Sequence, residues 1–219
     1  MKIHHLSSEN SIVHKFINEL RDVTIQNDRM RFRKNIHRIG EVLAYELSKT
    51  LKYTNKTIET PLAPYNASKI SDDVVICSVL RAGLPLHEGI LSFFDEAQNT
   101  FISAYRHHTN SENDFEIIVE YLASPSIEGK TLIIADPMLA TGQSLVAVQK
   151  ALEKMGTPKH IHIAAVIGAT QGISFVENHF PENTDLWIAA IDPELNEKGY
   201  IVPGLGDAGD LAYGTKLQH

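Results

Sequence analysis

The segment Thr131-Leu-Ile-Ile-Ala-Asp136-Pro-Met-Leu-Ala140-Thr-Gly-Gln-Ser144 decides the fold class of this chain. It starts as an apolar run that ends in an acid, continues through small residues and leads into a helical pattern at Ser144. Apolar strands of this kind are typical of open α/β sheets, whose ligands bind at the carboxyl ends of the strands. We therefore expect a buried strand, a ligand-binding turn and a helix, in that order.

The same pattern extends outward in both directions. Further apolar runs predict strands at 74–80, 101–105, 161–167 and 186–191, with 116–122 as another candidate, and helical patterns occupy 84–97, 144–155 and 172–179. The first 52 residues read as mostly helical, a loop rich in Pro and Asn follows them, and residues 200–219 are too rich in glycine for regular structure. Apolar strands that alternate with helices predict a Rossmann-like α/β fold, a parallel sheet flanked by helices.

Composition limits the classes of function. A length of 219 residues with 43% hydrophobic content suits one domain spanning 1–219. The 27 acidic residues outnumber the 20 Lys and Arg and give a net charge of −7, so we expect no nucleic-acid partner. A single cysteine, no signal-peptide pattern and no long apolar run predict a cytoplasmic protein with no membrane role.

The turn after Asp136 has the features of a phosphate site. Backbone N–H groups of residues 140–144, a helix N-terminus and the hydroxyls of Thr141 and Ser144 together suit a phosphate monoester. A carboxylate beside such a cradle suits ribose hydroxyls or a metal ion. The alternative is an ordinary strand-to-helix turn that Ser144 caps.

Two arginines follow predicted strands in the same way. Arg81 follows 74–80 and Arg106 follows 101–105, so both are expected at the sheet edge that carries Asp136. A pair of guanidinium groups there could bind a diphosphate in bidentate fashion. Either arginine taken alone is better explained as a surface residue.

The segment Gly204-Leu-Gly206-Asp-Ala-Gly209 formally satisfies a dinucleotide-binding pattern. It lies ten residues from the C-terminus, with no room for the βαβ unit that such a pattern requires. Its small residues allow the backbone to approach a flat ligand closely. The alternative is a glycine-rich tail without function.

Other chemistry finds little support in the sequence. Gly129-Lys130-Thr131 lacks the first glycine of a P-loop and precedes a strand. The eleven histidines show no zinc spacing and are expected to be mostly solvated. Cys77 sits inside an apolar strand and is a poor nucleophile.

Four segments resemble one known family, the uracil phosphoribosyltransferases. Asp136-Pro137-Met138-Leu139-Ala140-Thr141-Gly142 is similar to the family's motif for phosphoribosyl pyrophosphate (PRPP). Leu80-Arg81-Ala82-Gly83-Leu84, Tyr105-Arg106, and residues 199–210 with Gly214-Thr215 match in the same order. The resemblance implies a phosphoribosyltransferase fold with a helical N-terminal segment and a glycine-rich C-terminal loop for the base. It also implies transfer of the phosphoribosyl group of PRPP to uracil, giving UMP and pyrophosphate.

The resemblance assigns roles residue by residue. PRPP would be bound by Arg81, Arg106, Asp207 and the loop residues Asp136, Pro137, Met138, Leu139, Ala140, Thr141, Gly142, Gln143 and Ser144. Uracil would be bound by Ile201, Gly206, Asp207 and Ala208, and the catalytic residues would be Arg81, Arg106, Asp136 and Asp207. Magnesium would travel on the PRPP oxygens, with Asp207 as its protein contact. The family also implies a homo-oligomer, dimer or tetramer, and GTP as an effector of some members.

Two departures from the family and two rivals remain. Gln143 replaces a small residue, and 107–115 lacks the usual pattern of a mobile flap. One rival is a regulator of the same fold that binds PRPP, uracil or UMP and acts on RNA, but such regulators carry two adjacent acids where this chain has Asp136-Pro137. The other, a purine transferase, lacks the segment 200–210.

Overall fold

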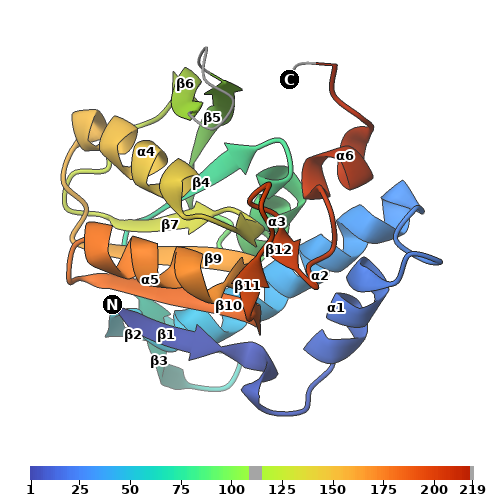
Figure 1. Cartoon of the computed structure of the whole chain (residues 1–219). Coiled ribbons are helices and arrows are strands. Elements are labelled where there is room, and N and C mark those ends of the chain that lie inside the picture. Colours follow the sequence, from blue (N-terminus) through green and yellow to red (C-terminus); the bar gives the residue numbers. More distant parts are fainter. Residues whose placement is uncertain (109–114, 218–219) are drawn as a thin grey trace.

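Most strands of the described chain form a single, mostly parallel sheet (Figure 1). The computed structural model describes residues 1–108 and 115–217, and the side chains of 105–117 lie outside that description. The strand order is β1 (Lys2–His5), β10 (Thr184–Asp192), β9 (His160–Ala169), β7 (Thr131–Ala135), β4 (Val74–Leu80), β5 (Gln98–His108) and β6 (Phe115–Ala123). Neighbouring strands on this path run parallel except β5 and β6, and the short β8 (Met138–Leu139) pairs with β9.

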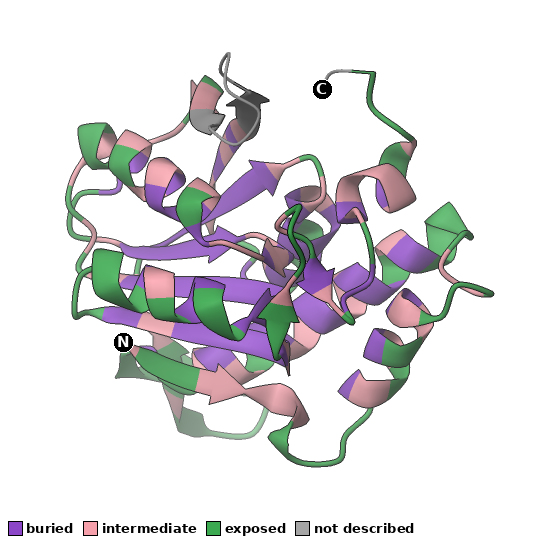
Figure 2. Cartoon of the chain, viewed as in Figure 1, coloured by how far each residue is buried: buried purple, intermediate pink, exposed green. Residues whose placement is uncertain are grey.

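Helices cover both faces of this sheet, which explains why its strands are apolar on both sides. Figure 1 shows α4 (Gln143–Leu152) and α5 (Thr170–His179) in front, with α2 (Arg29–Ser48) and α3 (Gly83–Leu91) behind. Within β4, Ile76 belongs to the core that contains α2, whereas Val75 and Cys77 belong to the core that contains α4. The central strands are accordingly buried along their length (Figure 2).

The chain reverses the direction of its crossovers between β4 and β7. From β4 it passes through α3 to β5, and from β7 it passes through α4 to β9 on the opposite side. Because α3 and α4 lie on opposite faces, the carboxyl ends of these two neighbouring strands flank a topological switch point. Ligands of open α/β sheets bind at such points.

Smaller elements surround the sheet. Helix α1 (Val13–Arg21) packs on α2, and β2 (Tyr53–Glu59) pairs with β3 (Pro64–Ile70) in a largely exposed hairpin. Near the C-terminus, β11 (Glu194–Leu195) pairs with β12 (Ile201–Val202), and α6 (Ala208–Tyr213) follows. Single 3-10 turns occur at Leu6–Ser8 and Glu153–Met155. No helix of the described chain has the length and apolar character needed to cross a bilayer.

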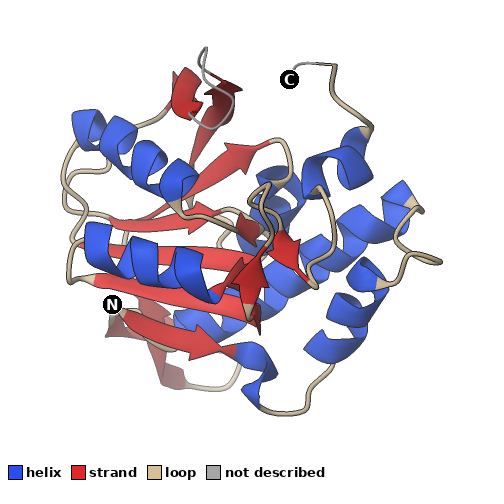
Figure 3. Ribbon diagram, in the orientation of Figure 1, coloured by secondary structure: helices blue, strands red, loops and turns tan. Residues whose placement is uncertain are grey.

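The predicted strands and helices are found, and four expectations need correction (Figure 3). Strand β1 lies in the region predicted as helical, because its pairing with β10, far along the chain, leaves no local pattern. The region predicted as a Pro- and Asn-rich loop contains the hairpin, where Pro64 starts an exposed strand and need not donate a ladder bond. Helix α3 ends at Leu91, short of residue 97. Helix α6 forms in the segment predicted as irregular, because Asp207 caps it.

Candidate active site

The loop after β7 is pinned at the sheet edge by backbone bonds. The Asp136 N–H donates to the Ala164 carbonyl at 3.1 Å, and the Pro137 carbonyl accepts two N–H groups of β9 at 3.1 and 3.0 Å. The Asp136 Oδ1 accepts the N–H of Met138 at 3.2 Å. These bonds place the Asp136 carboxyl group beside the switch point.

Helix α4 begins directly after the loop that the sequence predicts to bind phosphate, and its N-cap differs from the expected one. The N-cap is Gly142, whose φ of 81° and ψ of −13° lie in the left-handed region that favours glycine, and α4 begins at Gln143. Ser144 is the second residue of α4 and Gly142 is its N-cap, so the alternative of a Ser144 cap is wrong. The N–H groups of Ser144 and Leu145 have no acceptor among the described residues, which leaves them free for an anion. Gln143 is exposed, so it does not crowd the cradle.

The Asp136 carboxyl group is largely surrounded by protein, although the residue keeps some exposed surface, and it has no cationic partner in the described chain. Burial raises the pKa of Asp136 to about 7, and the Met138 N–H opposes this only weakly. Among the described residues, the Met138 N–H is the donor that this carboxyl group accepts from. Ribose hydroxyls would supply further donors. The same enclosure raises the pKa of the Cys77 thiol, as does the nearby Asp136, so Cys77 is a poor nucleophile.

Arg81 joins the end of β4 to the C-terminal segment. Its Nη2 donates to Asp210 Oδ1 at 2.7 Å, and its Nη1 donates to the Gly214 carbonyl at 3.1 Å. The Arg81 side chain is 41% exposed, so a ligand can reach it. Arg106 lies in β5 opposite Ile117, but its side chain falls outside the described part, as do residues 109–114 of the predicted flap.

The C-terminal segment is anchored in the apolar core on the α2 side of the sheet, where β12 contacts β9 and α6 contacts α2. Ile201 and Ala208 are buried in the same apolar cluster as Ala135, whereas Gly206 is exposed between them. The Asp207 carboxylate accepts the Asp210 N–H at 3.0 Å and Lys216 Nζ at 2.9 Å. Burial alone would raise the pKa of Asp207, but these bonds outweigh it and lower the pKa.

Three residues next to this segment were not predicted from the sequence: Arg21, Gln26 and Asp192. Asp192 ends β10 and is 4% exposed, and its carboxylate contacts Gly204. An acid at the end of an apolar strand is the signal that identified Asp136, so Asp192 could have been found. Nothing local in the sequence marks Arg21 or Gln26.

Two histidines are buried, contrary to expectation: His87 and His162. His160, His162 and Asp185 lie with potential ligand atoms within 4.8 Å of one another, at the amino ends of β9 and β10, away from the switch point. His162 Nδ1 accepts the Trp187 Nε1–H at 3.1 Å, which places the imidazole proton on Nε2. That proton blocks metal binding through Nε2, so the cluster is better explained as a packed polar network.

A hollow of about 850 Å³ lies between the last turn of α4 and the end of α5, lined by residues such as Gln149, Thr157 and Phe180. None of the predicted site residues lines it. The predicted site residues Asp136 and Arg81 lie instead at the carboxyl ends of β7 and β4, which flank the switch point.

Comparisons with known proteins agree with this geometry. A family model described as uracil phosphoribosyltransferase matches residues 7–215. A Porphyromonas gingivalis protein named uracil phosphoribosyltransferase is 54% identical over 217 residues, which cover 99% of this chain and 100% of that protein. One from Thermococcus gammatolerans is 40% identical over 213 residues, covering 96% and 92%. The solved structure of the AQ2163 protein from Aquifex aeolicus has a TM-score of 0.86 at 29% identity and covers 99% of this chain and 100% of that one.

The mostly parallel sheet flanked by helices is the fold of a phosphoribosyltransferase. The predicted fold class is thereby confirmed. Since the family model and the relatives span nearly all of the sequence, the chain belongs to the uracil phosphoribosyltransferase family.

Proposed function

We propose that this enzyme forms UMP and pyrophosphate from uracil and PRPP at the edge of the sheet between the loop after β7 and the C-terminal segment. The observation that carries the assignment is the pair of hydrogen bonds by which Arg81, at the end of β4 beside the switch point, binds Asp210 and Gly214 of the C-terminal segment. A phosphate, a ribose and a flat base can then be held side by side. Family membership gives the reaction, and the geometry supports the positions that we propose for the substrates.

The loop 140–145 binds the 5-phosphate of PRPP through its free N–H groups, and Asp136 accepts the ribose hydroxyls. Arg81 and Arg106 stabilise the departing diphosphate, on which negative charge develops as the bond to the anomeric carbon breaks. Catalysis is then mainly positioning and electrostatic stabilisation. For Arg81 the support is its exposed side chain at the end of β4. Arg106 is supported by its place in β5 and by the family motif.

Uracil lies against Ile201, Gly206, Asp207 and Ala208. The exposed backbone at Gly206, with a φ of 91°, can approach the flat base closely, and backbone N–H and C=O groups match the acceptors and donor of the uracil edge. Uracil N1 attacks the anomeric carbon from the face opposite the diphosphate.

Asp207 would be the protein contact of a magnesium ion held mainly by the oxygens of PRPP, and that ion would supply charge neutralisation to the diphosphate. The residues fit this role: the lowered pKa keeps Asp207 ionised, and a single carboxylate suits an ion that retains most of its waters. Lys216 neutralises Asp207 in this structure, so the lysine must yield if the ion contacts this carboxylate. A homo-oligomer, a GTP effect and a cytoplasmic location remain predictions.

One assay tests the function. The chain is incubated with PRPP, magnesium and uracil, cytosine, hypoxanthine or orotate, and product nucleotide is measured. UMP should form only with uracil and magnesium present. Faster use of hypoxanthine or orotate would reject the substrate assignment, and binding of PRPP and uracil without turnover would favour the regulatory alternative.

A further inference from the structure

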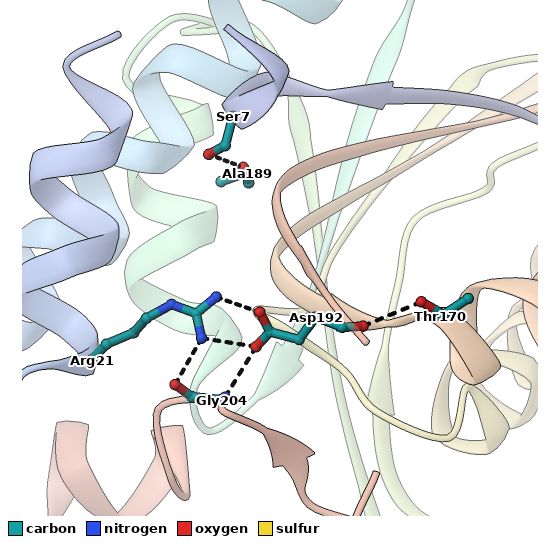
Figure 4. Close-up of polar contacts among 6 residues, drawn as sticks. All are labelled: Ser7, Arg21, Thr170, Ala189, Asp192 and Gly204. Atoms are coloured by element: carbon teal, nitrogen blue, oxygen red, sulfur yellow. Dashed lines mark hydrogen bonds and ion pairs between the residues drawn. The ribbon is translucent and has the colours of Figure 1, made fainter. Parts of the chain in front are cut away.

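The C-terminal segment is held at Gly204 from two directions (Figure 4). The Gly204 N–H donates to Asp192 Oδ2 at 3.0 Å, and the Gly204 carbonyl accepts from Arg21 Nη1 at 2.9 Å. Arg21 and Asp192 also form a bidentate ion pair, with N–O distances of 2.8 and 2.6 Å. Both main-chain polar groups of one residue are thus bound by a single charged pair.

The three partners come from parts of the chain that are far apart. Arg21 ends α1, Asp192 ends β10, and Gly204 follows β12. Gly204 has a φ of 61°, and a Cβ there would overlap the Ile201 carbonyl, so the segment turns sharply at this point. Charge-assisted bidentate bonds from rigid elements are strong and directional.

A second contact extends this hold by one residue. Gln26 Nε2 donates to the Leu205 carbonyl at 3.2 Å and to the Leu20 carbonyl at 2.8 Å. Gly204 and Leu205 are buried, whereas the next residue, Gly206, is exposed. The bonds therefore end directly before Gly206, the first of three consecutive proposed base contacts.

We infer that Arg21 and Asp192 are positioning residues that set the uracil-binding segment, so that the N-terminal helix controls base affinity and selectivity without touching the base. The inference rests on the proposed function of that segment. Recognition by backbone groups depends on their placement to about 0.5 Å, and displacements of about 1 Å can cost about 100-fold.

The chain contains a matched ion pair for comparison. Arg31 binds Glu19 in the same bidentate manner, with N–O distances of 2.9 and 3.1 Å. This pair links α2 to α1, whereas the Arg21–Asp192 pair links α1 to β10. It makes no hydrogen bond to the C-terminal segment within the described residues. Loss of the Arg31–Glu19 pair therefore shows how much stability is lost when the N-terminal helices are disturbed, without a change in the segment that is proposed to bind uracil.

The test compares Arg21→Lys with Arg31→Lys. A lysine retains the charge but cannot form the bidentate fork, so both variants should fold. We expect the KM for uracil to rise about 3- to 10-fold in Arg21→Lys, with the KM for PRPP changed by less than about twofold, and no change in Arg31→Lys. A double variant, Arg21→Met with Asp192→Asn, leaves no unpaired buried charge and should raise the KM for uracil about 10- to 100-fold.

Selectivity gives a second readout that a purely structural role would not change. The ratio of kcat/KM for uracil over cytosine should fall in both Arg21 variants, measured below their melting temperatures. An unchanged KM for uracil in folded Arg21→Lys and in the folded double variant would overturn the inference, as would equal rises in KM for both substrates. Absence of uracil turnover in the unaltered enzyme would instead reject the proposed function itself.

Discussion

Replacement of Asp136 by Asn should stabilise the folded chain near neutral pH and impair turnover. Burial raises the pKa of Asp136 to about 7 from an ordinary 3.8, so the folded chain retains a proton that the unfolded chain has lost. The wild-type chain therefore loses stability as the pH rises from about 4 to about 7. The pKa difference corresponds to about 4 kcal/mol, at about 1.4 kcal/mol per pKa unit. Because the residue keeps some exposed surface, that figure is an upper bound.

The measurement is urea unfolding of both proteins between pH 5 and pH 7.5. The Asp136→Asn variant carries no titratable group at this position, so its advantage over the wild type should grow by about 2 to 3 kcal/mol across this range, or about 5 to 10 °C in Tm. Turnover should fall about 10- to 100-fold, since an amide is a weaker acceptor for ribose hydroxyls than a carboxylate. Asp95→Asn, at an exposed acid, is the control and should change neither property.

Two results would refute this reasoning. A variant less stable than wild type by the same amount at every pH would mean that the carboxylate is ionised and paired within the fold. Wild-type turnover in Asp136→Asn would remove the residue from the active site.

The remaining predictions concern the cradle and the arginines. Gly142→Ala should reduce stability by more than about 1 to 2 kcal/mol and weaken PRPP binding in calorimetry, because its Cβ would lie 2.9 Å from backbone and side-chain atoms of α5. Gly129→Ala has a similar positive φ but open space around it, so it should show the backbone cost alone, and equal effects of the two substitutions would contradict the close packing. Arg81→Ala should lower kcat and kcat/KM for PRPP about 30- to 1,000-fold, whereas Asp210→Asn, which removes only its partner, should retain most of the turnover. Arg106→Ala should resemble Arg81→Ala at saturating uracil, and a neutral effect would show that the role was assigned to the wrong residue.

Local sequence determined the central fold and the loop between β7 and α4. The apolar runs of β4, β7, β9 and β10 are visible without a structure, because a strand buried on both faces must be apolar throughout. An acid followed by small residues and a helix likewise predicts a ligand-binding turn at the sheet edge. These features depend on neighbours in the chain, so local patterns are sufficient to predict them.

Tertiary structure decided what depends on distant partners. Strand β1 exists through its pairing with β10, and α6 through a cap at Asp207 that outweighs the high glycine content around it. The fold also decided that a Cβ at Gly142 would meet α5, not the anion cradle. Above all, Arg21 and Asp192 meet at Gly204. Arg21 and Asp192 are 171 positions apart in the sequence, and Asp192 and Gly204 are 12 positions apart. A charge-assisted contact between residues so far apart leaves no periodicity or motif in the sequence. It forms because the folded structure brings together the elements that carry its partners.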